Sequence, residues 1–127
     1  MIFIDELAEL AILGKKEVEV LVTRLAQRGR EAGIHLVVST QKPALEVIGS
    51  LARANFPVRI VGRVTTPEEA KVASGIARSG AERLLGRGDF LVVFSGQAIR
   101  FQAAYVKPEE IMELVKIERG GKVARVK

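Results

Sequence analysis

Residues 1–6 read Met1-Ile2-Phe3-Ile4-Asp5-Glu6, an apolar run that ends abruptly in two carboxylates. Such runs are typical of a strand that is buried on both faces, as the strands of parallel sheets are. In open α/β sheets, ligands bind at the carboxyl ends of the strands. The stretch therefore predicts an α/β fold in which Asp5 and Glu6 stand at the mouth of a ligand site.

The rest of the chain alternates between strand and helix patterns. Strands are predicted over residues 2–4, 34–40, 58–64, 89–94 and 97–105, and helices over residues 15–32, 43–54 and 108–117. Gly33 is expected to end the first helix. Early alternation of strands and helices predicts parallel strands with crossover helices, and the Ser95-Gly96 turn predicts a C-terminal antiparallel hairpin.

Two further helix starts follow from capping boxes, in which a hydroxyl residue precedes a glutamate by three positions. Thr66 with Glu69 forms one box, with Pro67 in the first turn, and Ser79 with Glu82 forms the other. We expect a short helix after each.

Composition indicates one globular domain of 127 residues. The chain has no cysteine and a single histidine, His35, which argues against disulfides and histidine-rich metal sites. No apolar stretch reaches the roughly 18 residues that a membrane span needs, so a cytoplasmic protein is expected. The net charge of +5 is concentrated in residues 116–127, which hold five Lys/Arg and one Glu. Charge therefore gives the body of the chain little support for nucleic-acid binding.

Polar residues also end the second predicted strand, in the order Ser39-Thr40-Gln41. An acidic pair beside a neutral donor suits phosphoryl transfer, in which one carboxylate holds Mg²⁺, another orients water and the donor contacts the phosphate. The alternative is that Asp5 and Glu6 simply open a loop or helix.

Five stretches, in order along the chain, resemble the FtsK/SpoIIIE family of DNA-translocating ATPases. They are residues 2–10, 19–30, 32–43, 54–60 and 80–91. The resemblance implies a partial RecA-like P-loop core with a mostly parallel sheet, in a motor that forms a hexameric ring around double-stranded DNA and uses ATP and Mg²⁺. It implies that residues 1–117 are the C-terminal portion of the motor domain, and residues 118–127 are expected to be a basic, disordered tail.

The same resemblance implies roles for single residues. Asp5 matches the Walker B carboxylate for Mg²⁺, Glu6 the catalytic base and Gln41 the polar sensor, while Thr40 is assigned with Asp5 to nucleotide binding. Arg30 matches an arginine presented to the neighbouring subunit's nucleotide.

Two lysines, Lys42 and Lys71, match residues of the loops that contact DNA phosphates. Pro67 departs from the family pattern, which often has a basic residue there. The alternatives are that Arg30 is the solvated end of a helix and Lys42 an ordinary loop residue. Arg59 and Arg63 could likewise be functional or belong to an edge strand or salt bridge.

A phosphate-binding loop of the form G-x-x-x-x-G-K-[ST] does not occur in the sequence. Neither Gly14-Lys15 nor Gly121-Lys122 fits it. We therefore expect a fragment or split-gene product that binds ATP poorly alone, relies on another chain for the Walker A half and self-associates through an uncovered sheet edge. The alternatives are a non-enzymatic DNA-binding or ring-assembly module, and a metal-dependent phosphoesterase that uses Asp5, Glu6 and Glu9.

Overall fold

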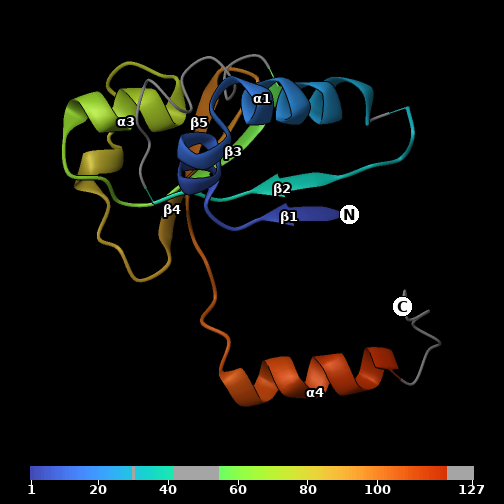
Figure 1. Cartoon of the computed structure of the whole chain (residues 1–127). Helices are drawn as coiled ribbons and strands as arrows, with labels where there is room; N and C mark the ends of the chain where they lie inside the picture. The colour runs from blue at the N-terminus through green and yellow to red at the C-terminus, as the bar shows by residue number, and fades with distance from the viewer. Residues whose placement is uncertain (30, 42–54, 120–127) are drawn as a thin grey trace.

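The N-terminal lobe is a short parallel sheet with a long helix between its strands (Figure 1). Strand β1 (Ile2–Ile4) pairs with β2 (Leu36–Val38), with Ile2 opposite Leu36. Helix α1 (Leu7–Arg28) supplies the crossover that parallel strands require. The lobe's core consists of buried Leu7 and Val22, against which Ile4, Val18, Leu36, Val38 and Phe56 pack. The computed structural model describes residues 1–29, 31–41 and 55–119 of the chain.

Helix α1 begins at Leu7, well before the predicted start at residue 15, because Glu6 caps it. The Glu6 side chain accepts a hydrogen bond from the Ala8 N–H (3.2 Å), which satisfies one of the free donors of the first turn. Gly29 is the C-cap, and its N–H donates to the Leu25 carbonyl (2.8 Å). Gly33, predicted to end the helix, instead lies in the turn before β2 with φ +66.

The C-terminal lobe is an antiparallel three-stranded sheet. Its strands β3 (Val58–Val61), β4 (Asp89–Phe94) and β5 (Gln97–Gln102) lie in that order. Ser95 and Gly96 join β4 to β5 with φ values of +50 and +77, the primed-turn geometry that suits a tight hairpin. The predicted hairpin is therefore confirmed.

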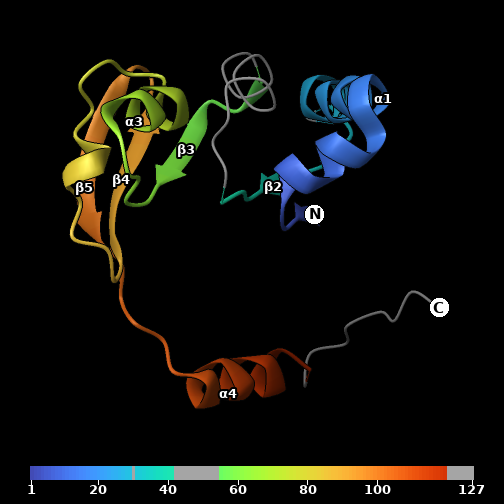
Figure 2. The same cartoon turned by 60° about the vertical axis from the view of Figure 1, so that its left-hand side comes forward.

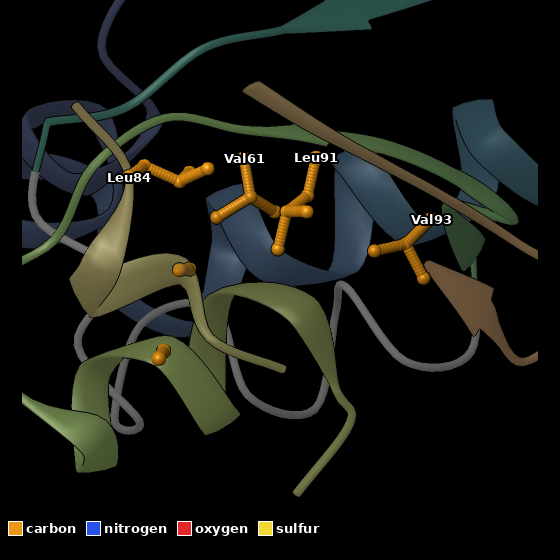
Figure 3. Packing of buried hydrophobic residues seen from close by; sticks show 6 residues of the cluster. Val61, Leu84, Leu91 and Val93 are labelled. Atoms are coloured by element: carbon orange, nitrogen blue, oxygen red, sulfur yellow. The ribbon is translucent and has the colours of Figure 1, made fainter. Parts of the chain in front are cut away.

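Helix α3 (Pro67–Ser74) and the 3₁₀ turn η1 (Ala81–Arg83) cover one face of this sheet (Figure 2). Between them lies the larger core of the described residues, shown in Figure 3. Its six buried members are Val61, Ala70, Ala81, Leu84, Leu91 and Val93.

The third strand differs from the prediction in its pairing. The alternating pattern predicts that β3 runs parallel to its sheet neighbour, but β3 pairs antiparallel with β4, with Val58 opposite Phe94 and Val61 opposite Leu91. The connection contains both α3 and η1 and returns the chain in the opposite direction, so β4 starts beside the end of β3. The fold is α/β as predicted, with its parallel pairing confined to β1 and β2 among the described residues.

One of the two predicted capping boxes forms. Thr66 Oγ1 accepts from the Glu69 N–H (3.2 Å), while Glu69 Oε2 accepts from the Thr66 N–H (3.2 Å). The second box is wrong: η1 has Gly80 at its N-cap with no side-chain bond, and the Ser79 hydroxyl donates to the Ala70 carbonyl (3.3 Å) instead. A tertiary partner for Ser79 has replaced the local one.

Helix α4 (Pro108–Arg119) lies apart from both sheets in Figures 1 and 2. Its side chains Ile111, Met112 and Leu114 are exposed. The predicted helix at residues 43–54 lies outside the described residues. Of the predicted tail 118–127, residues 118–119 belong to α4, and residues 120–127 lie outside the described residues. Of the helices in the described ranges, none has the length and apolar character that crossing a bilayer would require.

Candidate functional site

The carboxyl ends of β1 and β2 meet, because the two strands are parallel and in register. The Ser39 N–H donates to the Ile4 carbonyl (2.8 Å), and the Leu7 N–H donates to the Ser39 carbonyl (3.0 Å). These bonds hold the strand ends together just where the chain leaves the sheet. Asp5 and Glu6 are thus brought against the segment 39–41.

Glu6 is held from three directions. Besides the Ala8 N–H, its carboxylate accepts a hydrogen bond from the Gln41 N–H on Oε2 (2.8 Å) and one from the Thr40 hydroxyl on Oε1. The side chain is half-buried at the base of α1. Both oxygens therefore have a fixed orientation, which a general base needs in order to meet a reacting proton.

Asp5 is exposed beside Glu6. The Ser39 hydroxyl lies within hydrogen-bond distance of Asp5 Oδ1 (3.3 Å) and the Ile4 carbonyl oxygen (3.5 Å), and also against the Asp5 carbonyl oxygen, so one hydroxyl hydrogen is shared among three acceptors. The carboxylate is consequently placed by β2 but still open to solvent.

The donor set fits Mg²⁺ of the kind found with nucleotides. Mg²⁺ commonly takes one or two carboxylates and completes its shell with water and phosphate oxygens, so one exposed carboxylate such as Asp5 is a suitable ligand. Within the described ranges, no three His, Cys, Asp or Glu side chains gather into a metal-binding group. Asp5, Glu6 and Glu9 therefore do not form the acidic cluster that a two-metal phosphoesterase needs.

Four of the predicted site residues come together here: Asp5, Glu6, Thr40 and Gln41. The prediction treats Thr40 as a nucleotide ligand, whereas the structure shows its hydroxyl bonded to Glu6. Ser39 belongs to the same group of contacts but is absent from the predicted site residues. Its signal in the sequence is a hydroxyl directly after a strand that runs parallel to the acidic one.

The predicted basic residues do not join this group in the described structure. Lys71 is exposed on α3 in the C-terminal lobe, and Arg30 and Lys42 lie outside the described residues. Arg59 has a packing role: its Nε donates to the Phe56 carbonyl (3.4 Å), and its Nη1 would lie only 2.4 Å from a Cβ at Gly75. Arg63 is exposed just beyond β3.

An ion pair joins the buried carboxylate of Asp89 to the exposed side chain of Arg100 in the C-terminal lobe. Arg100 donates from Nε and Nη2 to the two carboxylate oxygens of Asp89 (2.8 and 2.7 Å), and the Leu85 N–H donates to Oδ2 (2.7 Å). These bonds, chiefly those from Arg100, lower the pKa of Asp89 from 3.8 to about 2. Asp89 on β4 therefore has a structural role, unlike Asp5 and Glu6, which follow β1 in the candidate site.

Comparison with known proteins gives a consistent result. Residues 1–45 match the sequence profile described as the FtsK/SpoIIIE family. The chain is 42% identical over 94% of its length to the DNA translocase FtsK of Leptospira interrogans, and 38% identical over 91% to the DNA translocase SpoIIIE of Bacillus subtilis. It spans only 13% and 15% of these relatives' lengths.

Solved structures agree on the fold. The monomer form of the pCW3 conjugation coupling protein TcpA with ATPγS superposes with a TM-score of 0.75 at 28% identity, over 91% of this chain and 36% of that one. The cytoplasmic domain of the type VII secretion ATPase EccC from Thermomonospora curvata superposes with a TM-score of 0.78 at 24% identity, over 98% of this chain and 15% of that one. Both indicate a P-loop ATPase fold. The sequence relatives show that the chain belongs to the FtsK/SpoIIIE family.

Proposed function

We propose that this chain is part of an ATP-driven motor that translocates double-stranded DNA, of the kind that segregates chromosomes at cell division. The observation that carries the proposal is the acid pair at the end of β1, held by three consecutive residues at the end of β2. Phosphoryl transfer needs positioning and electrostatic stabilisation more than covalent chemistry, and this arrangement supplies positioned acceptors. The translocase relatives support the DNA substrate.

The geometry supports the residue roles that the family resemblance implies. Asp5 would hold Mg²⁺ together with nucleotide phosphates, and the ion would supply positive charge at the transferring phosphoryl group. Glu6 would orient the attacking water and accept its proton. The exposed Gln41 side chain would contact the γ-phosphate. Because the Gln41 N–H also donates to Glu6, a shift of Gln41 would change the position of the Glu6 carboxylate.

The nucleotide affinity would come from elsewhere in the motor. A P-loop holds β- and γ-phosphates with backbone N–H groups and a lysine, and no such motif occurs in these 127 residues. We therefore propose that this chain works with a P-loop-bearing part and hydrolyses ATP poorly without it.

Three basic residues would complete the motor. Arg30 would contact the nucleotide of the neighbouring subunit in a ring, since a guanidinium supplied in trans stabilises the transferring phosphoryl group. Lys42 and Lys71 would contact DNA phosphates. Such contacts position a protein on DNA without recognising its base sequence. A chromosomal substrate would place the motor in the cytoplasm.

The test is phosphate release by the chain combined with a P-loop-bearing part, measured with and without double-stranded DNA. Glu6→Gln should lower the DNA-stimulated rate by about 10²–10⁴-fold, the range typical of a lost general base. Glu9→Gln is the matched control, since Glu9 is an exposed first-turn residue of the same helix. Equal rates for the two variants would contradict the role of Glu6. DNA binding with a steep salt dependence but no hydrolysis in any combination would instead indicate a non-enzymatic module.

A further inference from the structure

Two consecutive hydroxyl residues after β2 lie opposite the two consecutive carboxylates after β1. In the paired strands, which lie side by side in Figure 1, each residue of β1 is opposite the residue 34 positions later. The same offset continues beyond the strand ends, where the Ser39 hydroxyl bonds to Asp5 and the Thr40 hydroxyl to Glu6. The register of the sheet therefore gives each carboxylate its own hydroxyl partner.

The two pairs differ in their surroundings. Asp5 and Ser39 are both exposed, whereas Glu6 and Thr40 are both half-buried. Such alternation is expected of an extended chain, because its successive side chains point to opposite sides. One hydroxyl–carboxylate pair therefore stands in solvent and the next is partly shielded from it.

These surroundings suit two different tasks. Mg²⁺ in nucleotide sites keeps several water ligands, which an exposed carboxylate such as Asp5 allows. A general base must instead be aimed at one proton, and Glu6 is held by the Thr40 hydroxyl and by the N–H groups of Ala8 and Gln41. The difference between the two pairs thus matches the difference between the two tasks.

We propose that Ser39 and Thr40 are separate positioning residues, Ser39 orienting Asp5 toward Mg²⁺ and Thr40 orienting Glu6 toward the attacking water. This proposal rests on the function proposed above. Each hydroxyl acts through its carboxylate, as groups that bond to metal ligands commonly do when they tune metal affinity or activity. The two effects are separable, because the two hydroxyls serve different carboxylates.

Removing either hydroxyl should have unequal consequences for its partner. Among the described residues, Ser39 provides the hydrogen bond to the Asp5 carboxylate, so Ser39→Ala would leave that carboxylate free to rotate. Glu6 would keep two backbone N–H donors in Thr40→Val and would be loosened only in part. The Ser39 variant should therefore change side-chain order more than the Thr40 variant.

The first experiment uses the full chain alone and follows side-chain order by NMR. In Ser39→Ala, the three-bond couplings that report the Asp5 χ1 angle should become rotamer-averaged, while relaxation of the Glu6 methylene groups stays unchanged. Thr40→Val should mobilise the Glu6 methylene groups and leave the Asp5 couplings alone. Loosening of both carboxylates by either variant, or of neither by its own variant, would overturn the proposal.

The second experiment measures metal binding without nucleotide, with Mn²⁺ alone as the probe. Mn²⁺ should broaden the amide signals around Asp5 in the unmodified chain and not in Asp5→Asn. Ser39→Ala should raise the Mn²⁺ concentration needed for this broadening about 10-fold, the low end for a lost partner of a metal ligand. Thr40→Val should leave that concentration unchanged. Absence of broadening in the unmodified chain, or equal shifts in both variants, would contradict the proposal.

The third experiment measures ATP hydrolysis by the chain combined with a P-loop-bearing part and double-stranded DNA. Ser39→Ala should raise the Mg²⁺ concentration for half-maximal rate about 10-fold. Thr40→Val should instead lower kcat about 10-fold at an unchanged Mg²⁺ requirement, and Thr40→Ser, which keeps the hydroxyl, should restore it. Thr65→Val removes an exposed hydroxyl from the C-terminal lobe and should match the unmodified chain in both respects.

The outcomes separate this proposal from the proposed function. Equal losses of kcat and of Mg²⁺ affinity in both variants would indicate a general structural role and overturn the positioning roles, while leaving the motor function intact. No hydrolysis in any combination would refute the function, and the NMR couplings and Mn²⁺ binding would then decide whether each hydroxyl orients its own carboxylate.

Discussion

The two lobes differ in the size of their buried hydrophobic cores. The C-terminal lobe has six buried core residues between its sheet and α3, whereas the N-terminal cluster has two, Leu7 and Val22. Yet Asp5, Glu6 and Gln41, the candidate catalytic groups within the described residues, lie at the ends of β1 and β2, in the lobe with the smaller core. The side chains of the candidate site are therefore held in place chiefly by hydrogen bonds to Glu6 and Asp5, whereas hydrophobic packing stabilises the C-terminal lobe.

The largest expected effect is the loss of a core side chain from the C-terminal lobe. Leu91 is 5% exposed, so Leu91→Ala should lower the free energy of unfolding by about 2–5 kcal/mol through lost burial and a cavity. Leu21 on α1 is 57% exposed, and Leu21→Ala should change the free energy of unfolding by no more than about 0.5 kcal/mol. Urea unfolding of both variants measures the difference. Comparable losses would show that α1 is packed in solution against something further.

A second prediction concerns acid. The pKa of Asp89 is lowered to about 2 by Arg100 and the Leu85 N–H, so below pH 3.8 the unfolded chain takes up a proton that the folded chain does not. The stability that Asp89 contributes is therefore complete above about pH 3.8 and is lost as the pH falls toward 2.

Thermal unfolding between pH 2 and 5 checks this. The melting temperature of the unmodified chain should fall more steeply with acid than that of Asp89→Asn. Glu68→Gln, at an exposed position of α3, should follow the unmodified chain. Parallel curves for all three proteins would show that the Asp89–Arg100 pair does not control acid stability.

The sequence predicted well those features that depend on local chemistry. The Thr66–Glu69 box and the Ser95-Gly96 turn form because their partners lie within a few residues. It predicted poorly what depends on distant partners: Ser79 bonds to Ala70 across nine positions, and the partner of β3 follows from how α3 and η1 turn the chain. The start of α1 was missed because glutamate is not a favoured N-cap and acts here while also bound to Thr40 and Gln41.

The same division between local and distant contacts applies to the candidate site. Parallel strands place Asp5 and Glu6 opposite residues 39–41, which the strand order alone implies. That the Thr40 hydroxyl binds Glu6 rather than standing free for a nucleotide could not be foreseen, since it depends on side-chain positions on two strands.

A third prediction compares one glycine from each lobe. Gly75 and Gly33 both have positive φ, +74 and +66, so alanine strains the backbone at either position. Only at Gly75 would the new Cβ meet a neighbour, Arg59 Nη1 at 2.4 Å, while at Gly33 nothing lies within 4 Å. Gly75→Ala should therefore cost about 1–2 kcal/mol by chemical denaturation, slightly more than the about 1 kcal/mol of Gly33→Ala, because only the flexible end of Arg59 has to move aside. If Arg59→Ala in the Gly75→Ala background restored nothing, the collision would not be the cause.

The smallest effect is expected at the site itself, and it should be local. Thr40→Val keeps the side-chain shape but removes the hydroxyl that binds Glu6 Oε1, at a cost of about 1 kcal/mol. Because Glu6 also caps α1, loosening its carboxylate should speed hydrogen exchange at the Ala8 and Gln41 amides, both of which donate to it. Exchange in β4 should stay unchanged, since the C-terminal core does not include these contacts. Faster exchange in both lobes would mean that the molecule unfolds as one unit, and then the separation between a packed lobe and a hydrogen-bonded site would not hold.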